Sequence, residues 1–247
     1  MTIWRAILFG LVQGLTEFLP VSSSGHLILL ERLSFAPPSV FLNLTLHLAT
    51  LLAVLVTMRR EVWAVVRHPV RGDLKYLIAA SVPTVVIALA FEAFCPALTE
   101  GAMLPFCFLA TTCLLVLGDT FSKGRSRDIS IGNSLLVGAV QGVAVLPGIS
   151  RSGATISALR MCGVDRERAT AFSFLMSIPV IAGGFLIEGV KSGFSVEGVT
   201  VTELLLASVV AFLSGLFAAK FMLGKRMGML PFAIYTFVLG IVSFFLL

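Results

Sequence analysis

Charged side chains are scarce in this 247-residue chain: Asp, Glu, Lys and Arg together make up 13% of it, whereas hydrophobic residues make up 57%. Soluble domains carry roughly 25% charged residues. The composition therefore excludes an ordinary soluble globule, and its hydrophobic content also excludes a disordered chain. With a mean hydropathy of +1.02, the sequence predicts an all-α polytopic membrane protein.

Acidic residues are fewer than basic ones, 13 against 18, so the net charge is +5. The basic residues are scattered between long apolar runs, which fits cytoplasmic loops better than a nucleic-acid surface. We therefore expect membrane lipids and no nucleic acid as partners. The four cysteines form no Cys-x-x-Cys pair, so we expect buried, unreactive thiols: Cys95, Cys107, Cys113 and Cys162. The first apolar run has no basic segment before it and no cleavage site, so we expect it to be retained.

A membrane-spanning helix needs about 20 mostly apolar residues. Six stretches approach that length: 40–57, 76–94, 102–118, 170–190, 203–223 and 229–247. Two others, at about 3–33 and 131–162, are interrupted by Pro, Gly and Ser, so neither half could cross alone. Irregular backbone at membrane depth is tolerated only where protein buries it or it lines a wet cavity. Both stretches therefore predict re-entrant hairpins, each with a polar tip inside the membrane.

Basic residues orient the spans, because Lys and Arg are enriched in cytoplasmic loops. Four connections are basic and are predicted to be cytoplasmic; their residues are Arg59, Arg60, Arg67, Arg71 and Lys75, then Lys123, Arg125 and Arg127, then Arg166 and Arg168, then Lys225 and Arg226. The connections near 92–101 and 191–203 carry few basic residues and are predicted to be outside. The first hairpin then begins and ends outside, and the second begins and ends inside.

This alternation predicts two inverted-topology repeats in one integral membrane domain, residues 1–118 and 130–247, joined by a cytoplasmic connection at 119–129. Each repeat has a re-entrant hairpin followed by three spans. Short matches support the repeat: Val12-Gln13-Gly14 resembles Val140-Gln141-Gly142, and Leu19-Pro20 resembles Leu146-Pro147. Inverted repeats place their ligand near the membrane midplane, where the broken helices meet.

Gln13 and Glu17 lie four residues apart in the first hairpin, so they share one face of the expected helix. A carboxyl group at this depth is costly and indicates function. It could hold a divalent cation, Mg²⁺ or Ca²⁺, that shares phosphate ligands, or it could orient a catalytic base. The alternative is a carboxyl kept neutral or hydrogen-bonded to a neighbouring helix.

The tip of the first hairpin carries Ser22, Ser23, Ser24 and Gly25 before a helix that we expect to begin near His26. Backbone amides at such a helix start bind anions, above all phosphate. A hydroxyl beside an imidazole is also the general design of nucleophilic catalysis. The alternative for the serines is helix capping, and for His26 it is an interhelical hydrogen bond.

The second tip contributes Arg151, flanked by Ser150 and Ser152, with Thr155 one helical turn later. An arginine inside an apolar hairpin requires an anionic partner, and its guanidinium group matches phosphate oxygens. The alternative is a buried salt bridge with Glu17, and both could hold at different stages of turnover.

Other polar residues have simpler explanations. Asn43 and His47 share a face of the 40–57 span and are expected to form interhelical hydrogen bonds, with a secondary place in the cavity open. Glu188 and Asp119 lie near helix ends and are expected to be solvated. Arg160 is expected to extend its charge toward the cytoplasmic surface.

Together, the carboxylate, hydroxyls, imidazole and guanidinium are complementary to a phosphate or diphosphate group, and the apolar surroundings suggest that a lipid carries it. The segments QGLTEFLPVSSSGH at 13–26, PGISRSGAT at 147–155 and LPFAIY at 230–235 resemble the motifs of bacterial undecaprenyl-diphosphate phosphatases, the bacitracin-resistance family. The resemblance covers essentially the whole chain. It implies an inner-membrane enzyme, with its active site toward the periplasm, that converts undecaprenyl diphosphate to the monophosphate for cell-wall synthesis.

The resemblance also implies roles for individual residues. Catalysis falls to Ser23, His26, Glu17 and Arg151, with Ser23 as nucleophile and His26 as proton acceptor, or with His26 itself attacking. Substrate binding falls to Gln13, Ser22, Ser24, Gly25, Ser150, Ser152 and Thr155. Glu17 and Gln13 are the expected ligands of a divalent cation, although Gln13 stands where a second Glu is common in the family. Thr236 stands where a basic residue is expected.

Three questions stay open at this point. Inverted repeats with broken helices are also the usual construction of transporters, so the same cavity could move a polyprenyl phosphate or another anion across the membrane. A non-catalytic lipid-binding protein is a further alternative, but binding a neutral lipid would not offset the cost of burying Glu17 and Arg151. A homodimer is open as well.

Overall fold

The computed structural model describes residues 2–34, 40–69, 72–122, 126, 128–193, 199–224 and 228–246. Twelve helices lie within these residues, and the only β-type pairing there is one isolated bridge between Ser126 and Val164. The first half contains α1 (Ile3–Phe18), α2 (Ser23–Ser34), α3 (Val40–Thr57), α4 (Arg59–Arg67), α5 (Leu74–Phe94), α6 (Pro96–Thr99) and α7 (Leu104–Thr120). The second half contains α8 (Ile131–Val143), α9 (Arg151–Met161), α10 (Arg166–Lys191), α11 (Val201–Gly224) and α12 (Leu230–Leu246).

Four helices in the described part of the chain, α3, α5, α10 and α11, are long and apolar enough to cross a bilayer. This confirms a polytopic all-α membrane protein. The other two predicted spans correspond to α7 and α12, which are apolar and 17 residues long, so their crossing stays a prediction.

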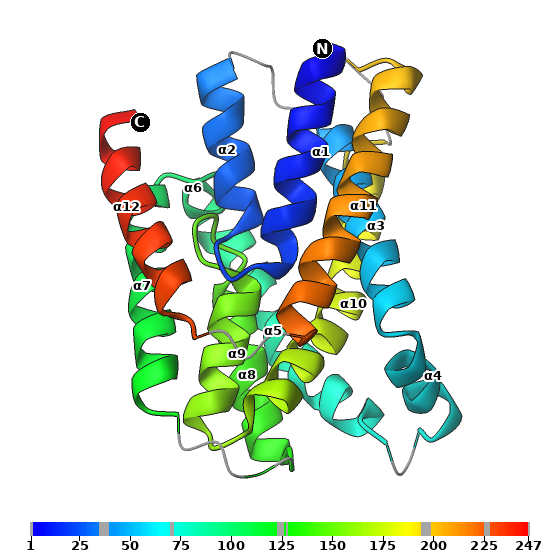
Figure 1. Cartoon of the computed structure of the whole chain (residues 1–247), viewed down its shortest axis with the longest axis vertical. Coiled ribbons are helices and arrows are strands. Elements are labelled where there is room, and N and C mark those ends of the chain that lie inside the picture. The colour runs from blue at the N-terminus through cyan, green and yellow to red at the C-terminus, as the bar shows by residue number, and fades with distance from the viewer. Residues whose placement is uncertain are drawn as a thin grey trace.

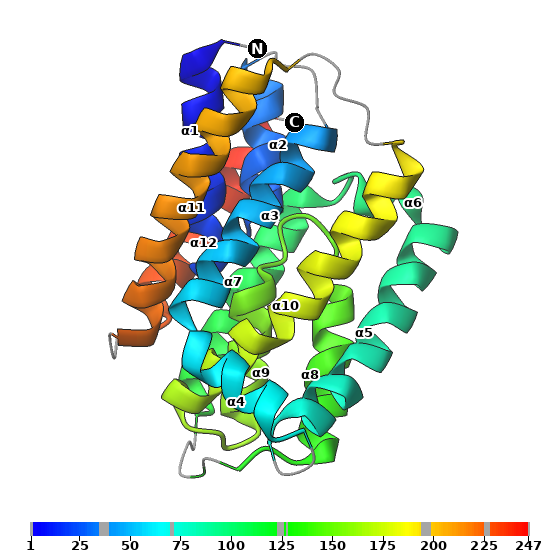
Figure 2. The same cartoon turned by 90° about the vertical axis from the view of Figure 1, so that its right-hand side faces the viewer.

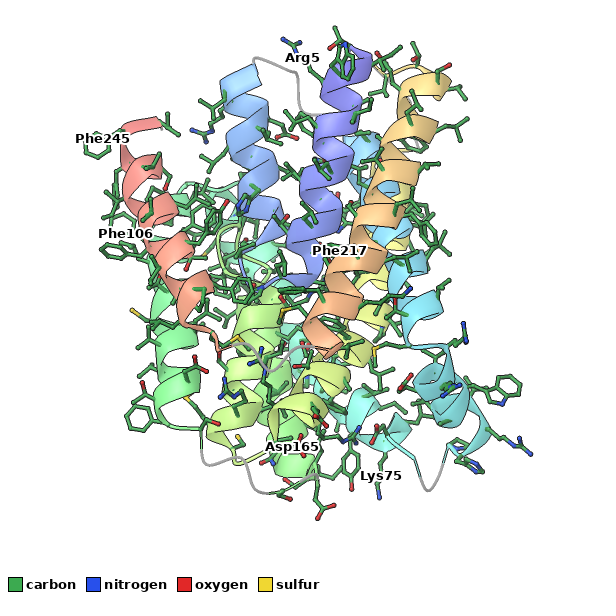
Figure 3. All side chains as sticks on the ribbon, viewed as in Figure 1. Arg5, Lys75, Phe106, Asp165, Phe217 and Phe245 are labelled. Carbon is green, nitrogen blue, oxygen red and sulfur yellow. The ribbon has the colours of Figure 1, made fainter. Side chains whose placement is uncertain are left out.

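The lateral surface of the helix bundle is apolar. Figure 3 shows Phe106 and Phe245 on one flank of the bundle and Phe217 on the face toward the viewer, whereas Arg5 lies at one end and Lys75 and Asp165 lie at the other. The three phenylalanines are 53%, 65% and 86% exposed, as expected for side chains that face lipid. Charge at the two ends and aromatic rings between them fit a bilayer around the bundle.

Two helix hairpins enter the bundle from opposite ends. Helices α1 and α2 descend from and return to the end that carries the N-terminus, and α8 and α9 do the same from the other end (Figure 1). The view in Figure 2 shows the same arrangement, with α3 and α10 beside the hairpins. The interrupted apolar runs predict both hairpins, and the helix boundaries agree with the predicted stretches to within one residue.

The first helix of each hairpin packs closely on a helix from the other half of the chain through two glycines four residues apart. A Cβ atom at Gly10 would lie 2.3 Å from the carbonyl oxygen of Ala207 on α11, and one at Gly138 would lie 2.1 Å from that of Ala80 on α5. Gly14 and Gly142 make equivalent close approaches one turn later. This small-xxx-small spacing lets helix backbones meet inside a membrane, and it fixes each hairpin against the opposite half.

Several side-chain expectations are wrong. Arg160 does not reach for the surface, because it forms an ion pair with Asp119, whose other carboxylate oxygen accepts a hydrogen bond from the backbone N–H of Met229. Asp119 is therefore a structural link between α7, α9 and α12 rather than a solvated residue. Of the four free cysteines, only Cys107 is buried, Cys162 is intermediate, and Cys95 and Cys113 are exposed.

The basic residues that predict the orientation lie partly outside the described part of the chain. The basic residues Arg71, Lys123, Arg125, Arg127, Lys225 and Arg226 lie outside the described residues. Among the described ones, Arg168 forms a two-pronged ion pair with Asp73, which ties the start of α10 to the start of α5.

Candidate active site

The two hairpin tips meet in the middle of the bundle and are joined by hydrogen bonds. The Ser22 hydroxyl oxygen accepts from the backbone N–H of Gly148 at 3.1 Å, and the Ser152 hydroxyl donates to the Leu19 carbonyl at 3.2 Å. A Cβ atom at Gly25 would lie 2.6 Å from Phe108 Cζ and 3.1 Å from the Gly148 backbone, so a glycine allows this close approach. The tips therefore form one continuous polar centre from two distant segments.

Ser22 holds a strained turn at the first tip. Its φ of 70° lies in the left-handed region, which costs a residue other than glycine about 1–2 kcal/mol. Helix α2 begins at Ser23, three residues before the predicted start at His26, because the Ser22 hydroxyl caps it by accepting from Gly25 N–H at 3.4 Å. The turn places the Ser23 side chain beside α1.

Glu17 is the centre of the polar cluster, and its side chain is only 2% exposed. One carboxylate oxygen accepts a hydrogen bond from Ser23 Oγ at 2.6 Å and another from Gln13 Nε2 at 2.9 Å. The other oxygen is ion-paired with Arg151 Nη2, from the second hairpin. The salt bridge considered from the sequence is therefore present, and it spans the two tips.

His26 is turned away from Ser23, contrary to the expectation that it accepts the serine proton. Its Nδ1 donates to the Ser22 carbonyl at 2.6 Å, and its Nε2 accepts from the Tyr235 hydroxyl of α12 at 2.7 Å. The His26 ring also stacks on the Tyr235 ring, with 5.6 Å between their centroids. Both nitrogens are thus committed to holding the Ser22 turn, and the group bonded to Ser23 is Glu17.

A cavity of about 280 Å³ opens beside this cluster. Six of the residues predicted for the site line it: Glu17, Ser22, Ser23, Ser24, Ser150 and Arg151. Apolar side chains of α3 and α10 form much of the remaining wall, from Leu44 and from Val180, Ile181 and Phe185. The cavity thus joins a polar end at the hairpin tips to an apolar flank.

Five predicted site residues do not line the cavity, namely Gln13, Gly25, His26, Ser152 and Thr155. Thr155 is fully buried, and its hydroxyl is bonded to the Arg151 carbonyl and to Ser173 on α10. Contact between Thr155 and substrate therefore stays a prediction, since its hydroxyl is bonded to a neighbouring helix in this arrangement. Gln13 is also fully buried, and its amide nitrogen contacts Glu17 and His47.

Three polar residues outside the predicted site also line the cavity: Thr16, His47 and Glu188. His47 forms the expected interhelical hydrogen bond, with 2.9 Å between its Nδ1 and Gln13 Nε2, and it also takes the secondary place in the cavity. Asn43, on the same helix face, instead donates to Glu31 at 3.0 Å. The Glu188 side chain is 47% exposed, as expected for a solvated residue, and it also lies on the cavity wall, 3.6 Å from Lys191.

The donor atoms offer a metal ion only a partial set of ligands. No cluster of three or more His, Cys, Asp or Glu side chains suited to a metal occurs among the described residues. Glu17 supplies carboxylate oxygens that already accept from Arg151, Ser23 and Gln13. Gln13 Oε1 is buried without a hydrogen-bond partner and is a free oxygen donor. A hard cation would thus need further oxygens from a bound phosphate.

Comparison with known proteins identifies the family. The profile of the family described as bacitracin resistance protein BacA matches residues 6–242. The chain belongs to this family.

Individual relatives agree with this assignment. An undecaprenyl-diphosphatase of Carboxydothermus hydrogenoformans is 39% identical over 250 residues, covering 98% of this chain and 96% of the relative. Proteins of the same name from Christiangramia forsetii and Korarchaeum cryptofilum are 37% and 34% identical, and each match covers 98% of this chain and at least 97% of the relative. The similarity therefore extends over the hairpins, the spans and the cavity.

Proposed function

We propose that this protein hydrolyses undecaprenyl diphosphate to undecaprenyl phosphate and inorganic phosphate. The reaction would return the lipid carrier to cell-wall synthesis and would confer resistance to bacitracin. The observation that carries the proposal is the hydroxyl–carboxylate–guanidinium cluster of Ser23, Glu17 and Arg151 on one cavity beside an apolar wall. Membership of the bacitracin resistance family and relatives named undecaprenyl-diphosphatase support it.

In the proposed mechanism, Ser23 Oγ attacks the terminal phosphorus and Glu17, 2.6 Å away, takes its proton. A bond forms between Ser23 Oγ and phosphorus, and the bond from that phosphorus to the bridging oxygen breaks, which releases the lipid monophosphate. Water then attacks the same phosphorus: a bond forms from the water oxygen to phosphorus, the bond from Ser23 Oγ to phosphorus breaks, Glu17 returns its proton to Ser23 Oγ, and inorganic phosphate leaves. Arg151 compensates the negative charge on the phosphoryl oxygens. His26 positions the Ser22 turn and does not act as the nucleophile, because both of its nitrogens are occupied.

The proposal includes a divalent cation, Mg²⁺ or Ca²⁺, which would bind together with the diphosphate. Glu17 and the unpaired Oε1 of Gln13 would hold it together with phosphate oxygens. When bound, it would supply additional positive charge near the phosphate. The test is phosphate release with chelator and after readdition of each ion; full activity in chelator would remove the cation from the proposal.

We further propose that residues 1–118 and 130–247 are inverted-topology repeats joined by 119–129. Support comes from the two hairpins that enter from opposite ends and from their matching Gly-x-x-x-Gly helices. The cavity wall on α10 extends to Glu188, toward the end that carries the N-terminus. In the topology expected from the basic loops this end faces the periplasm of the inner membrane. A homodimer stays an expectation.

The decisive experiment is phosphate release from C55 isoprenyl diphosphate by the purified protein. We expect stoichiometric release, and we expect Ser23→Ala and Arg151→Ala to abolish it while the helical content stays unchanged. Ser81→Ala is the matched control, because Ser81 bonds only to the Leu77 carbonyl on α5, away from the cavity. Transport without any phosphate release would favour the carrier alternative. A phosphoryl group trapped on His26 would contradict the assignment of Ser23.

A further inference from the structure

His47 connects α3 to the centre of the site without being part of either hairpin. Its Nδ1 lies 2.9 Å from Gln13 Nε2 and 3.5 Å from Glu17 Oε2. Its side chain is 31% exposed, and the residue lines the cavity together with Ser23 and Arg151. The imidazole therefore has one edge in the polar cluster and another part open to the cavity.

The hydrogen bonds around Gln13 determine which imidazole nitrogen carries hydrogen. The Gln13 amide nitrogen must face Glu17, because a carboxylate paired with Arg151 is an acceptor only. The same amide nitrogen faces His47 Nδ1, which therefore accepts a hydrogen bond. A neutral imidazole whose Nδ1 accepts carries its hydrogen on Nε2. Among the described residues, no group is hydrogen-bonded to that Nε2.

We propose that His47 Nε2–H is a donor to the terminal phosphoryl group of the bound diphosphate, and afterwards to the inorganic phosphate product. The proposal rests on the function proposed above. Nδ1 faces the fully buried Gln13, whereas the side chain as a whole is 31% exposed, so Nε2 is the ring nitrogen left for a ligand in the cavity. Hydrogen bonds to ionised phosphate oxygens are stronger than those between neutral groups.

The terminal phosphate is the group within reach because Ser23 attacks that phosphorus. Ser23 Oγ and His47 Nδ1 lie on the same carboxylate oxygen of Glu17, at 2.6 Å and 3.5 Å. Arg151 approaches the other oxygen of that carboxylate. A phosphoryl group seated on Ser23 would thus have a guanidinium from α9 and an imidazole N–H from α3 around it.

Two substitutions of His47 separate the donor role from simple support of Gln13. An asparagine amide overlaps the Nδ1 position of histidine, so His47→Asn can still accept from Gln13 but has no group at Nε2. A glutamine amide reaches the Nε2 position, so His47→Gln can still donate into the cavity. Asn43→Ala is the control, because Asn43 lies one turn earlier on α3 and bonds to Glu31 instead.

Binding of inorganic phosphate is measured first, by ligand-induced thermal stabilisation of the purified protein, and KM for C55 diphosphate is measured second. We expect His47→Asn to weaken phosphate binding about tenfold, equivalent to about 1.4 kcal/mol, and to raise KM by a similar factor. His47→Gln is expected to stay within about threefold of the parent (roughly 0.7 kcal/mol by the same conversion), and Asn43→Ala is expected to match the parent.

Any other order of the variants overturns the inference. If His47→Asn matches the parent and His47→Gln is weak, His47 only holds Gln13; if both match the parent, the imidazole does not touch phosphate. A raised KM with unchanged phosphate binding would place His47 against the lipid-side phosphate and refute the terminal assignment. Because phosphate binding needs no turnover, a parent protein that binds phosphate but releases none would refute the proposed function and still test His47.

Discussion

The ion pair between Glu17 and Arg151 connects the two hairpins, and removing one partner should reveal its importance for folding. Arg151→Met leaves the Glu17 carboxylate charged inside the bundle, with its side chain only 2% exposed. Breaking a buried pair in this way costs roughly 3–5 kcal/mol. Ser23 and Gln13 still donate to one carboxylate oxygen, so we expect the lower end, about 3 kcal/mol.

A second substitution should restore part of this loss. Glu17→Gln in the Arg151→Met background removes the unpaired charge while keeping an oxygen for Ser23 to contact. We expect an interaction energy of about 2 kcal/mol in the resulting double-mutant cycle, within the range for contacting residues. The measurement is unfolding in mixed micelles of increasing sodium dodecyl sulfate content, followed by circular dichroism.

The control is the exposed pair of Lys191 and Glu92, whose side chains are 48% and 43% exposed. Lys191→Met should leave the unfolding midpoint unchanged, because solvent screens such pairs. If the effects of Glu17→Gln and Arg151→Met simply add, the two residues are not coupled in the folded protein and the meeting of the tips is refuted. Glu17→Gln, Arg151→Met and the double variant should all lose phosphate release. The second substitution should therefore restore stability without restoring activity.

Three further predictions concern other parts of the bundle. Tyr235→Phe removes the hydroxyl donor to His26. It should lower the free energy of unfolding by about 1–3 kcal/mol and should reduce kcat more than it changes KM. Tyr76→Phe, at the other tyrosine, should change neither. Gly138→Ala places a Cβ 2.1 Å from the Ala80 carbonyl oxygen and should lower the melting temperature. Gly183→Ala meets no atom within 4 Å and should leave the melting temperature unchanged. Equal effects of the two substitutions would refute the close packing of α8 on α5. Gly184→Leu fills open space on the cavity wall and should raise KM for C55 diphosphate without weakening inorganic phosphate binding; an unchanged KM would show that the lipid chain does not follow α10.

The positions of the hairpins could be predicted from sequence because the information is local. Pro20 and Pro147 interrupt apolar runs that are otherwise long enough to be helices, and α1, α2, α8 and α9 end or begin close to these interruptions. Glu17 and Arg151 could also be expected to form an ion pair, because burying each charge separately inside the membrane is too costly. Their ion pair was therefore one of the two alternatives that the sequence left open.

The partners of His26 and Thr155 could not be predicted in the same way, because they are set by tertiary packing. Tyr235 lies 209 residues from His26 in the sequence, and only the placement of α12 against the first tip brings its hydroxyl to Nε2. Thr155 lies one turn after Arg151, yet the rotation of α9 turns its hydroxyl to Ser173. Helical spacing identifies residues that share a face, but it does not identify what that face contacts.

Asn43 and His47 illustrate the same limit on a single helix. They share a face of α3, and both form the interhelical hydrogen bonds expected of polar groups in a membrane. One turn of helix separates a residue bonded to Glu31 from a residue that lines the cavity. The motifs at the hairpin tips do not include His47. The signal that could have indicated it is Gln13, which stands where a second Glu is common in the family and needs a hydrogen-bond partner.

The arrangement of Ser23, Glu17 and Arg151 couples proton transfer to charge compensation. Before reaction, Glu17 is paired with Arg151, so the guanidinium charge is largely compensated within the protein. When Glu17 accepts the Ser23 proton in the proposed mechanism, its carboxylate becomes neutral and no longer competes for Arg151. The guanidinium is then available to the phosphoryl oxygens at the stage when negative charge on them must be stabilised. One buried ion pair across the two tips can therefore keep Arg151 in place in the resting enzyme and provide its charge to the substrate during attack.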